Sequence, residues 1–247
     1  MYEHNIKLVL AYDGKHYHGW QRQKSESTIQ SVIEEKIQVM VGDPVNVVAS
    51  GRTDAGVHAL NQVCNFITRS NIDPEAIRKG LNSLLPHDIL VKDAKYAPLE
   101  FHSRYSAKSK VYDYRVLNQG YPDIFLRHYV WHIRPPLDIK EIKRCLPLLL
   151  GTHDFSSFKS SGSENTNPVR SITRAEIHGP EHGRLYFIVE ADGFLRHMVR
   201  NMVGTLAEVG LGKINFRDFG KILEAKDRRS AGIKAPPQGL FLVNVRY

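Results

Sequence analysis

Ser50-Gly51-Arg52-Thr53-Asp54-Ala55-Gly56-Val57-His58-Ala59 is a loop-like stretch with an apolar run on each side. Two glycines bracket one carboxylate, Asp54, and Arg52 stands two residues before it. Glycine permits positive φ and close backbone approach, so the loop can hold Asp54 in a shape that few sequences adopt. A fixed positive charge favours the ionised carboxylate that a nucleophile or base requires. An ordinary turn is the alternative, since Gly, Asp, Ser and Thr dominate turns. Because residues 57–60 follow without a polar spacer, we expect the loop to be held against the core.

Strands and helices alternate on both sides of this loop. We expect strands at residues 6–12, 45–49, 63–67 and 88–94, and helices at 29–40 and 74–84. The later sequence predicts a basic, strand-like segment at 101–118, helices at 138–150, 193–208 and 216–225, and strands at 170–178, 184–191 and 239–245. This content predicts an α+β fold in two similar halves, residues 1–104 and 105–247. No sequence period is clear enough to define a repeat.

The composition favours a polyanionic partner. The 247 residues carry 34 Lys and Arg against 26 Asp and Glu, a net charge of +8, and phosphate contacts dominate nucleic-acid affinity. Cys64 and Cys145 lie in apolar surroundings, which predicts buried free thiols in a reducing compartment. The sequence has no bilayer-length apolar run and no signal-peptide pattern, so we expect a soluble, cytoplasmic protein without a membrane contact.

The sequence lacks the usual signatures of metal and cofactor chemistry. It has no Cys-x-x-Cys, no Asp-x-Asp, no dinucleotide fingerprint and no P-loop. None of the 12 histidines, His58 and His102 included, forms a metal-binding pair on a predicted helix. We therefore expect neither a metal nor a cofactor.

Aromatic, basic and amide side chains gather at residues 16–23, among them Trp20, Gln21 and Arg22. Such side chains stack on and hydrogen-bond to single-stranded RNA. A loop folded on the core is the alternative.

Two later segments also contain candidate site residues. Tyr112 and Tyr114 alternate along a predicted strand, so both point to one face, where packing in the sheet is the simplest role. Arg200 lies between the apolar positions of a predicted helix, so part of its side chain should be drawn inward. A semi-buried arginine needs an acidic or phosphate partner.

Three strings resemble the bacterial tRNA pseudouridine synthase A family: the loop from Ser50 to Ala59, Lys110-Val111-Tyr112-Asp113-Tyr114, and residues 194–204. The resemblance extends over essentially the whole chain. It implies the pseudouridine synthase fold, in which two halves share a mainly antiparallel central sheet with an active-site cleft between them. It also implies a homodimer that converts uridine to pseudouridine, without a cofactor, on the 3′ side of the anticodon stem-loop of tRNA after base flipping.

The resemblance assigns roles to individual residues. Asp54 matches the catalytic aspartate, which acts as a nucleophile or as the base that starts elimination at the sugar. Tyr112 matches the tyrosine that stacks on the target uracil, and Arg200 matches the arginine that pairs with the aspartate. Arg52 is expected to hold RNA or to assist flipping. The other candidate RNA contacts are Trp20, Gln21, Arg22 and His58.

Two other functions compete with this one. A non-catalytic tRNA- or RNA-binding protein would explain the charge and the aromatic–basic segment, but it has no need for a glycine-bracketed aspartate with an arginine partner. A phosphotransferase or hydrolase with an aspartate nucleophile would need a metal and a second acid near Asp54, and the surrounding sequence offers neither.

Overall fold

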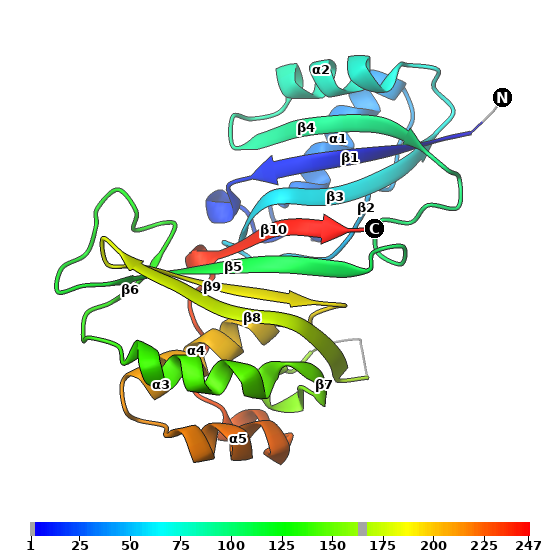
Figure 1. The fold of residues 1–247 in the computed structure, drawn as a ribbon. Coiled ribbons are helices and arrows are strands. Elements are labelled where there is room, and N and C mark those ends of the chain that lie inside the picture. Colours follow the sequence, from blue (N-terminus) through cyan, green and yellow to red (C-terminus); the bar gives the residue numbers. More distant parts are fainter. Residues whose placement is uncertain (1–2, 163–166) are drawn as a thin grey trace. The chain divides into compact units, whose positions relative to one another are not determined.

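The computed structural model describes residues 3–162 and 167–247. It divides into two compact units, of which the first contains the residues up to Lys108 together with Phe241–Tyr247, and the second contains Ser109–Leu240 (Figure 1). The predicted halves, residues 1–104 and 105–247, differ from these units chiefly because the end of the chain lies in the first unit.

The sheet of the first unit is built around β3 (His58–Thr68), the strand that follows the Asp54 loop. β1 (His4–Tyr12) pairs antiparallel with β3 and, on its other side, with β4 (Ile89–Ala97). β2 (Val48–Ala49) pairs antiparallel with β3, while β10 (Leu240–Arg246) pairs parallel with it and sets Phe241 opposite His58. The Asp54 loop therefore connects two paired strands of one sheet.

The two helices of the first unit begin where local signals predict. α1 (Ile29–Val41) starts at a capping box made by Thr28 and Ser31 and ends at Gly42, whose φ is 87°. α2 (Pro74–Leu84) starts at Asp73, whose side chain accepts a hydrogen bond from the backbone N–H of Glu75. α1 contacts α2, and α2 contacts β4.

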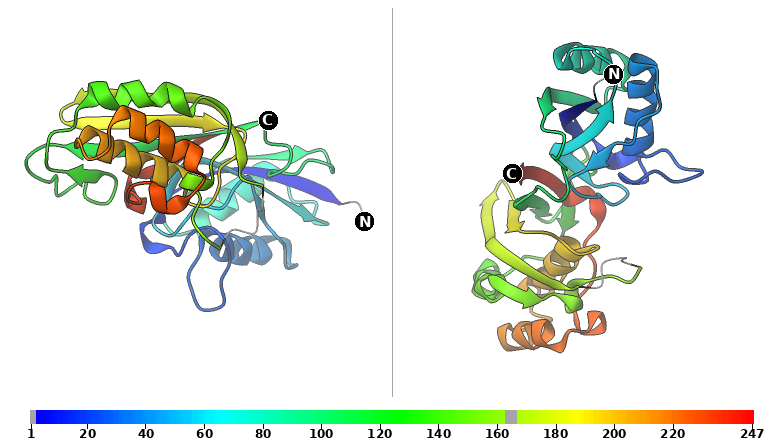
Figure 2. Two further views of the ribbon diagram at one scale, coloured as in Figure 1. Left: turned by 90° about the horizontal axis from the view of Figure 1, so that it is seen from below. Right: turned by 90° about the vertical axis from the view of Figure 1, so that its right-hand side faces the viewer.

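The second unit has its own mainly antiparallel sheet. Its strand order is β7 (Gly151–Asp154), β8 (Val169–Glu181), β9 (Arg184–Ala191) and β5 (Ser109–Asn118), and β6 (Trp131–Ile133) pairs parallel with β5. Its helices are α3 (Ile139–Cys145), α4 (Met198–Gly210) and α5 (Phe216–Ala225). α4 contacts β5 and α3 contacts both other helices, and the three lie together on one face of the sheet (Figures 1 and 2). The predicted α+β class with mainly antiparallel sheet is confirmed.

Some predicted boundaries were wrong. β5 begins at Ser109 rather than near residue 101, because residues 101–106 form a turn closed by Ser106 N–H donating to the carbonyl of His102. α4 begins at Met198 rather than at 193, because His197 has a φ of 62°, outside the helical region. The helix expected at 138–150 is α3 followed by a 3-10 turn at Leu146–Leu149. The short strands β6 and β7 were not predicted.

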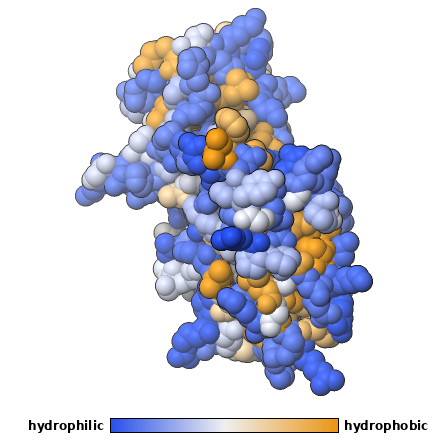
Figure 3. Space-filling model, turned by 90° about the vertical axis from the view of Figure 1, so that its left-hand side faces the viewer, coloured by the Kyte–Doolittle hydropathy of each residue, from blue (hydrophilic) through white to orange (hydrophobic). Residues whose placement is uncertain are grey.

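Both cysteines are buried and free, as predicted. Across residues 3–162 and 167–247, no helix has the length and apolar character needed to cross a membrane. The face in Figure 3 is largely hydrophilic, and hydrophilic residues interrupt its hydrophobic ones.

Candidate active site

The Asp54 loop is held closely against the core of the first unit. The backbone N–H of Val57 donates to the carbonyl of Asp54 at 3.1 Å, and Gly56 has a φ of 75°, so the chain turns sharply just after the carboxylate. Val57, His58 and Ala59 are each at most 2% exposed, which confirms the prediction that this stretch is held against the core. Asp54 itself is half-buried, so its carboxylate lies near the surface on a constrained backbone.

A buried hydrogen-bond network supports the residues before Asp54. The Tyr12 hydroxyl lies 2.8 Å from Thr53 Oγ1, and Gln62 Nε2 donates to the carbonyl of Gly51 at 2.9 Å. Ser50 Oγ donates to Gln62 Oε1 at 2.7 Å. Tyr12 and Gln62 were missed as site residues in the sequence analysis. The available signal was a glutamine directly before the apolar strand predicted at 63–67, since a buried amide needs polar partners.

The segment before α1 supports the loop through its backbone. Trp20 N–H donates to the carbonyl of Thr53 at 3.0 Å, and Gly56 N–H donates to the carbonyl of Tyr17 at 3.3 Å. Gly19 has a φ of 88°, and a Cβ at that position would lie 2.6 Å from the carbonyl oxygen of Thr53. Only glycine allows the two segments to approach this closely.

The four candidate RNA contacts of the first unit fall into two classes. Trp20 and His58 are buried, whereas Gln21 and Arg22 are exposed. His58 Nδ1 accepts the N–H of Gly14 at 3.1 Å, and its ring stacks on Phe241 with centroids 4.6 Å apart. Direct contact of Trp20 or His58 with RNA would require their exposure. In this structure both serve to hold the surrounding backbone.

Arg22 and Arg52 have different surroundings. Arg22 Nη1 lies 3.1 Å from Glu34 Oε2, and the Arg22 N–H donates to Gln30 Oε1 at 3.0 Å, which ties this exposed residue to α1. Arg52 is exposed at the start of the Asp54 loop.

Tyr112 lies on β5 in the second unit. It is largely buried, and its ring packs edge-on against Phe194 with centroids 5.0 Å apart and planes at 88°. The neighbouring Tyr114 is fully buried and donates its hydroxyl to the carbonyl of Pro236 at 2.7 Å. Burial raises the pKa of Tyr114, and the positive charge of Arg200 offsets part of this rise. The structural role predicted for Tyr114 agrees with these contacts.

Arg200 lies in the first turn of α4 and is only 6% exposed, as the prediction of an inward side chain requires. Its Nε donates to the carbonyl of Ala235 at 2.8 Å, and the N–H of Ala235 donates to the carbonyl of Arg200 at 3.1 Å. Gly204, one turn further along, permits this contact, since a Cβ there would lie 1.8 Å from the carbonyl oxygen of Ile233. Ala235 therefore holds both the backbone of Arg200 and the Nε of its guanidinium group.

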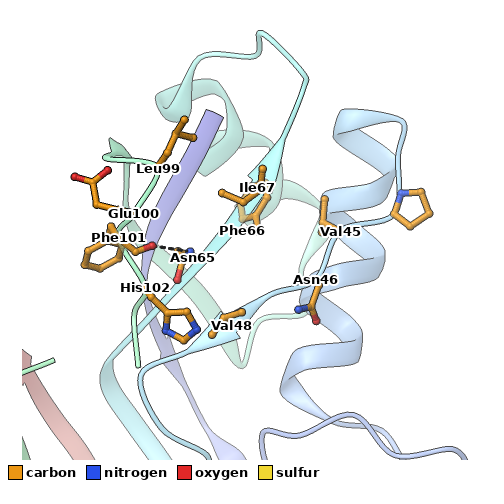
Figure 4. A pocket seen from close by; sticks show the side chains of 11 residues that line it. Val45, Asn46, Val48, Asn65, Phe66, Ile67, Leu99, Glu100, Phe101 and His102 are labelled. Carbon is orange, nitrogen blue, oxygen red and sulfur yellow. Dashed lines mark hydrogen bonds between the residues drawn. The ribbon is translucent and has the colours of Figure 1, made fainter. Parts of the chain in front are cut away.

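A separate hollow of about 340 Å³ lies in the first unit (Figure 4). Leu99 and His102 line one side, Val45 and Val48 the other, and Phe66 of β3 lies between them. None of the predicted site residues lines it. Among the described residues, no group of three or more His, Cys, Asp or Glu side chains could hold a metal ion.

The sequence of this chain is similar to those of known proteins. Residues 8–106 and 146–247 match the family described as tRNA pseudouridine synthase. A relative from Thermoanaerobacter sp. (strain X514), named tRNA pseudouridine synthase A, is 48% identical over 98% of this chain and 99% of its own. Relatives of the same name from Acetivibrio thermocellus and Clostridium kluyveri are each 45% identical over 98% of this chain and 99% of theirs. A solved structure titled "Crystal Structure of a Cbf5-Nop10-Gar1 Complex" aligns with 96% of this chain and 57% of its own at a TM-score of 0.36 and 11% identity, which is too distant to bear on the fold.

Proposed function

The chain belongs to the tRNA pseudouridine synthase family, and on this premise we propose that Asp54 is its catalytic residue. The enzyme is an isomerase that converts uridine to pseudouridine within tRNA. The observation that carries the assignment to Asp54 is the supported loop: a half-buried carboxylate sits on a backbone fixed by hydrogen bonds to Gly51, Thr53 and Gly56. A catalytic group must be held in this way before the substrate arrives.

The reaction breaks the N1–C1′ bond of uridine and forms a C5–C1′ bond, and the proton on C5 is replaced by one on N1. Substrate and product are isomers, so no oxidant, reductant or water is consumed. Asp54 acts either as the nucleophile or as the base that starts elimination at the sugar. The target base must first leave its stack to reach this carboxylate.

Arg200 and Tyr112 complete the proposed chemistry. Arg200 is 6% exposed, and the family resemblance pairs it with the catalytic aspartate. On family resemblance we assign Arg200 to the active site as the partner of the catalytic aspartate. Tyr112, whose ring is fixed edge-on against Phe194, is assigned to stack on the uracil.

Family resemblance supports the proposals for the target uridines, the assembly and the location. We propose uridines on the 3′ side of the anticodon stem-loop as targets, a homodimer as the active assembly and the cytoplasm as the location. We also propose that the chain has two α+β halves, residues 1–104 with Asp54 and residues 105–247 with Tyr112 and Arg200. Arg52, Gln21 and Arg22 are exposed and are assigned to contact RNA.

The test is to incubate the protein with an unmodified tRNA transcript and to map pseudouridine by carbodiimide labelling and primer extension. Stops on the 3′ side of the anticodon stem-loop are expected. Pseudouridine elsewhere would contradict only the assigned target region, whereas tight tRNA binding without any pseudouridine would favour the RNA-binding alternative.

A further inference from the structure

The turn at residues 101–106 carries an aromatic and basic cluster, called here the 102–105 cluster, which is made by the half-buried His102 and the exposed Arg104 and Tyr105. Tyr105 is 78% exposed, so its ring contributes little to the core. The ring centroids of His102 and Tyr105 are 4.3 Å apart at 30°, and the Arg104 guanidinium carbon lies 5.7 Å from the centre of the Tyr105 ring. The three side chains therefore form one contiguous surface.

The backbone that presents this cluster is fixed at several points. His102 Nδ1 accepts the N–H groups of both Arg104 and Tyr105 at 3.2 Å. Ser103 N–H donates to Asn65 Oδ1 at 2.9 Å, and the Tyr247 hydroxyl donates to the Ser103 carbonyl at 2.8 Å. Exposed side chains on a fixed backbone lose less entropy when they bind a partner. The cluster is thus preorganised for a contact.

The chemistry of the cluster suits RNA. Because His102 Nδ1 accepts two hydrogen bonds, the proton of a neutral ring lies on Nε2, where it can be donated. Two further cations lie close by. Lys7 Nζ lies 4.7 Å from the ring centre of Tyr247 and 5.3 Å from that of Phe101. Lys108 is exposed. Rings stack on unpaired bases while cations contact phosphates.

The neighbouring hollow lacks this character. His102 contributes to its lining, but the only charged residue in that lining is Glu100, which would repel a phosphate. Its walls are mostly apolar. A polyanion should therefore contact the 102–105 cluster, which carries the positive charge of Arg104, rather than the hollow.

We infer that the 102–105 cluster is a tRNA-binding site in addition to the Asp54 loop, at which an unpaired nucleotide of tRNA stacks on Tyr105 and Arg104 contacts an adjacent phosphate. The inference rests on the proposed function, because that function makes tRNA the substrate. It assigns the cluster to binding rather than to the chemical step.

The test compares Tyr105→Ala, Tyr105→Phe and Tyr96→Ala with the wild-type full-length protein. Tyr96 is a matched control, since it is also an exposed tyrosine beside a histidine, His4, with ring centroids 5.4 Å apart. Tyr105→Ala should weaken tRNA affinity about tenfold, the size of one lost base–aromatic stack. KM should rise accordingly while kcat stays unchanged, and Tyr105→Phe and Tyr96→Ala should match the wild type. Arg104→Gln should lower the slope of log affinity against log salt by about one.

Equal affinities for Tyr105→Ala and Tyr96→Ala would overturn the inference, as would equal losses in Tyr105→Ala and Tyr105→Phe, since the latter keeps the ring. Circular dichroism melting checks that each variant is folded. Affinity is measured independently of turnover, so the two proposals can fail separately. A wild type that forms no pseudouridine contradicts the proposed function, whereas an active wild type with an unaffected Tyr105→Ala contradicts only the second site.

Discussion

The phenolic oxygen of Tyr12 lies 2.8 Å from Oγ1 of Thr53, the residue immediately before Asp54. Both side chains are buried, and Gln62 Nε2 lies 3.3 Å from the same phenolic oxygen. The last residue of β1 is thereby linked to the loop that carries the proposed catalytic carboxylate. Removal of this one hydroxyl should affect both stability and turnover.

Tyr12→Phe should lower the free energy of unfolding by about 1 kcal/mol, because it removes the hydrogen-bond partner of the buried Thr53 hydroxyl. It should also lower kcat several-fold without changing tRNA affinity, because the loop loses a constraint. Urea unfolding and tritium release from tRNA measure the two effects. Tyr96→Phe, which alters an exposed tyrosine, serves as the control. A destabilised variant with wild-type kcat would show that the loop does not depend on this contact.

The same tyrosine predicts a loss of stability in alkali. Burial raises the pKa of Tyr12 from 10.0 to about 12, so the folded protein retains a proton that the unfolded chain releases above pH 10. The folded-state pKa is the higher one, so the contribution to stability is complete below pH 10 and is lost as the pH rises towards 12. Between pH 10 and 11 the loss should be about 1 kcal/mol for this group. Measured by urea unfolding, the free energy of unfolding of Tyr12→Phe should fall less between pH 10 and 11 than that of the wild type. An equal fall in both proteins would contradict the assignment of this pH dependence to Tyr12.

Alanine variants at Gly19 and Gly42 test the close approach of Gly19 to Thr53 in the Asp54 loop. Their φ angles are 88° and 87°, but a Cβ at Gly19 would meet Thr53 O at 2.6 Å, whereas one at Gly42 has nothing within 4 Å. Both alanine variants should lose about 1 kcal/mol of stability from the left-handed backbone. Gly19→Ala should in addition displace the Asp54 loop and reduce kcat strongly, while Gly42→Ala keeps full activity. Equal activity in the two variants would show that the approach of Gly19 to Thr53 is unnecessary.

A second pair of glycines tests the support of Arg200. In α4, a Cβ at Gly204 would lie 1.8 Å from Ile233 O, whereas in α5 the nearest atom to a Cβ at Gly220 is 3.9 Å away. Gly220→Ala should stabilise the protein by up to about 1 kcal/mol through helix propensity. Gly204→Ala should instead destabilise it and lower kcat, because the segment that holds Arg200 must move. Thermal melts show whether the two substitutions change stability in opposite directions. A stabilising Gly204→Ala would contradict the close contact of Gly204 with Ile233.

Local signals in the sequence were sufficient for much of the fold. The starts of α1 and α2 and the tight hold on residues 57–59 follow from residues next to each other in the chain. The inward position of Arg200 follows from helical periodicity alone. These features depend on short-range geometry, which a sequence expresses directly.

Contacts between distant segments were not predictable in this way. The parallel pairing of Phe241 with His58 joins residues far apart in the chain, and no local pattern indicates it. Trp20 illustrates a second limit, because an aromatic residue within a basic, amide-rich stretch looks the same whether it is exposed to RNA or buried. Its burial depends on the backbone hydrogen bond to Thr53, which only the folded structure reveals.

We propose that Asp54 performs the chemistry rather than the binding. The most direct test of this proposal is Asp54→Asn, assayed with tRNA that carries tritium at C5 of uracil, with tRNA affinity measured in parallel. We expect release of tritium by the wild type, none by the variant, and the same tRNA affinity for both. Release by Asp54→Asn at the wild-type rate would contradict it.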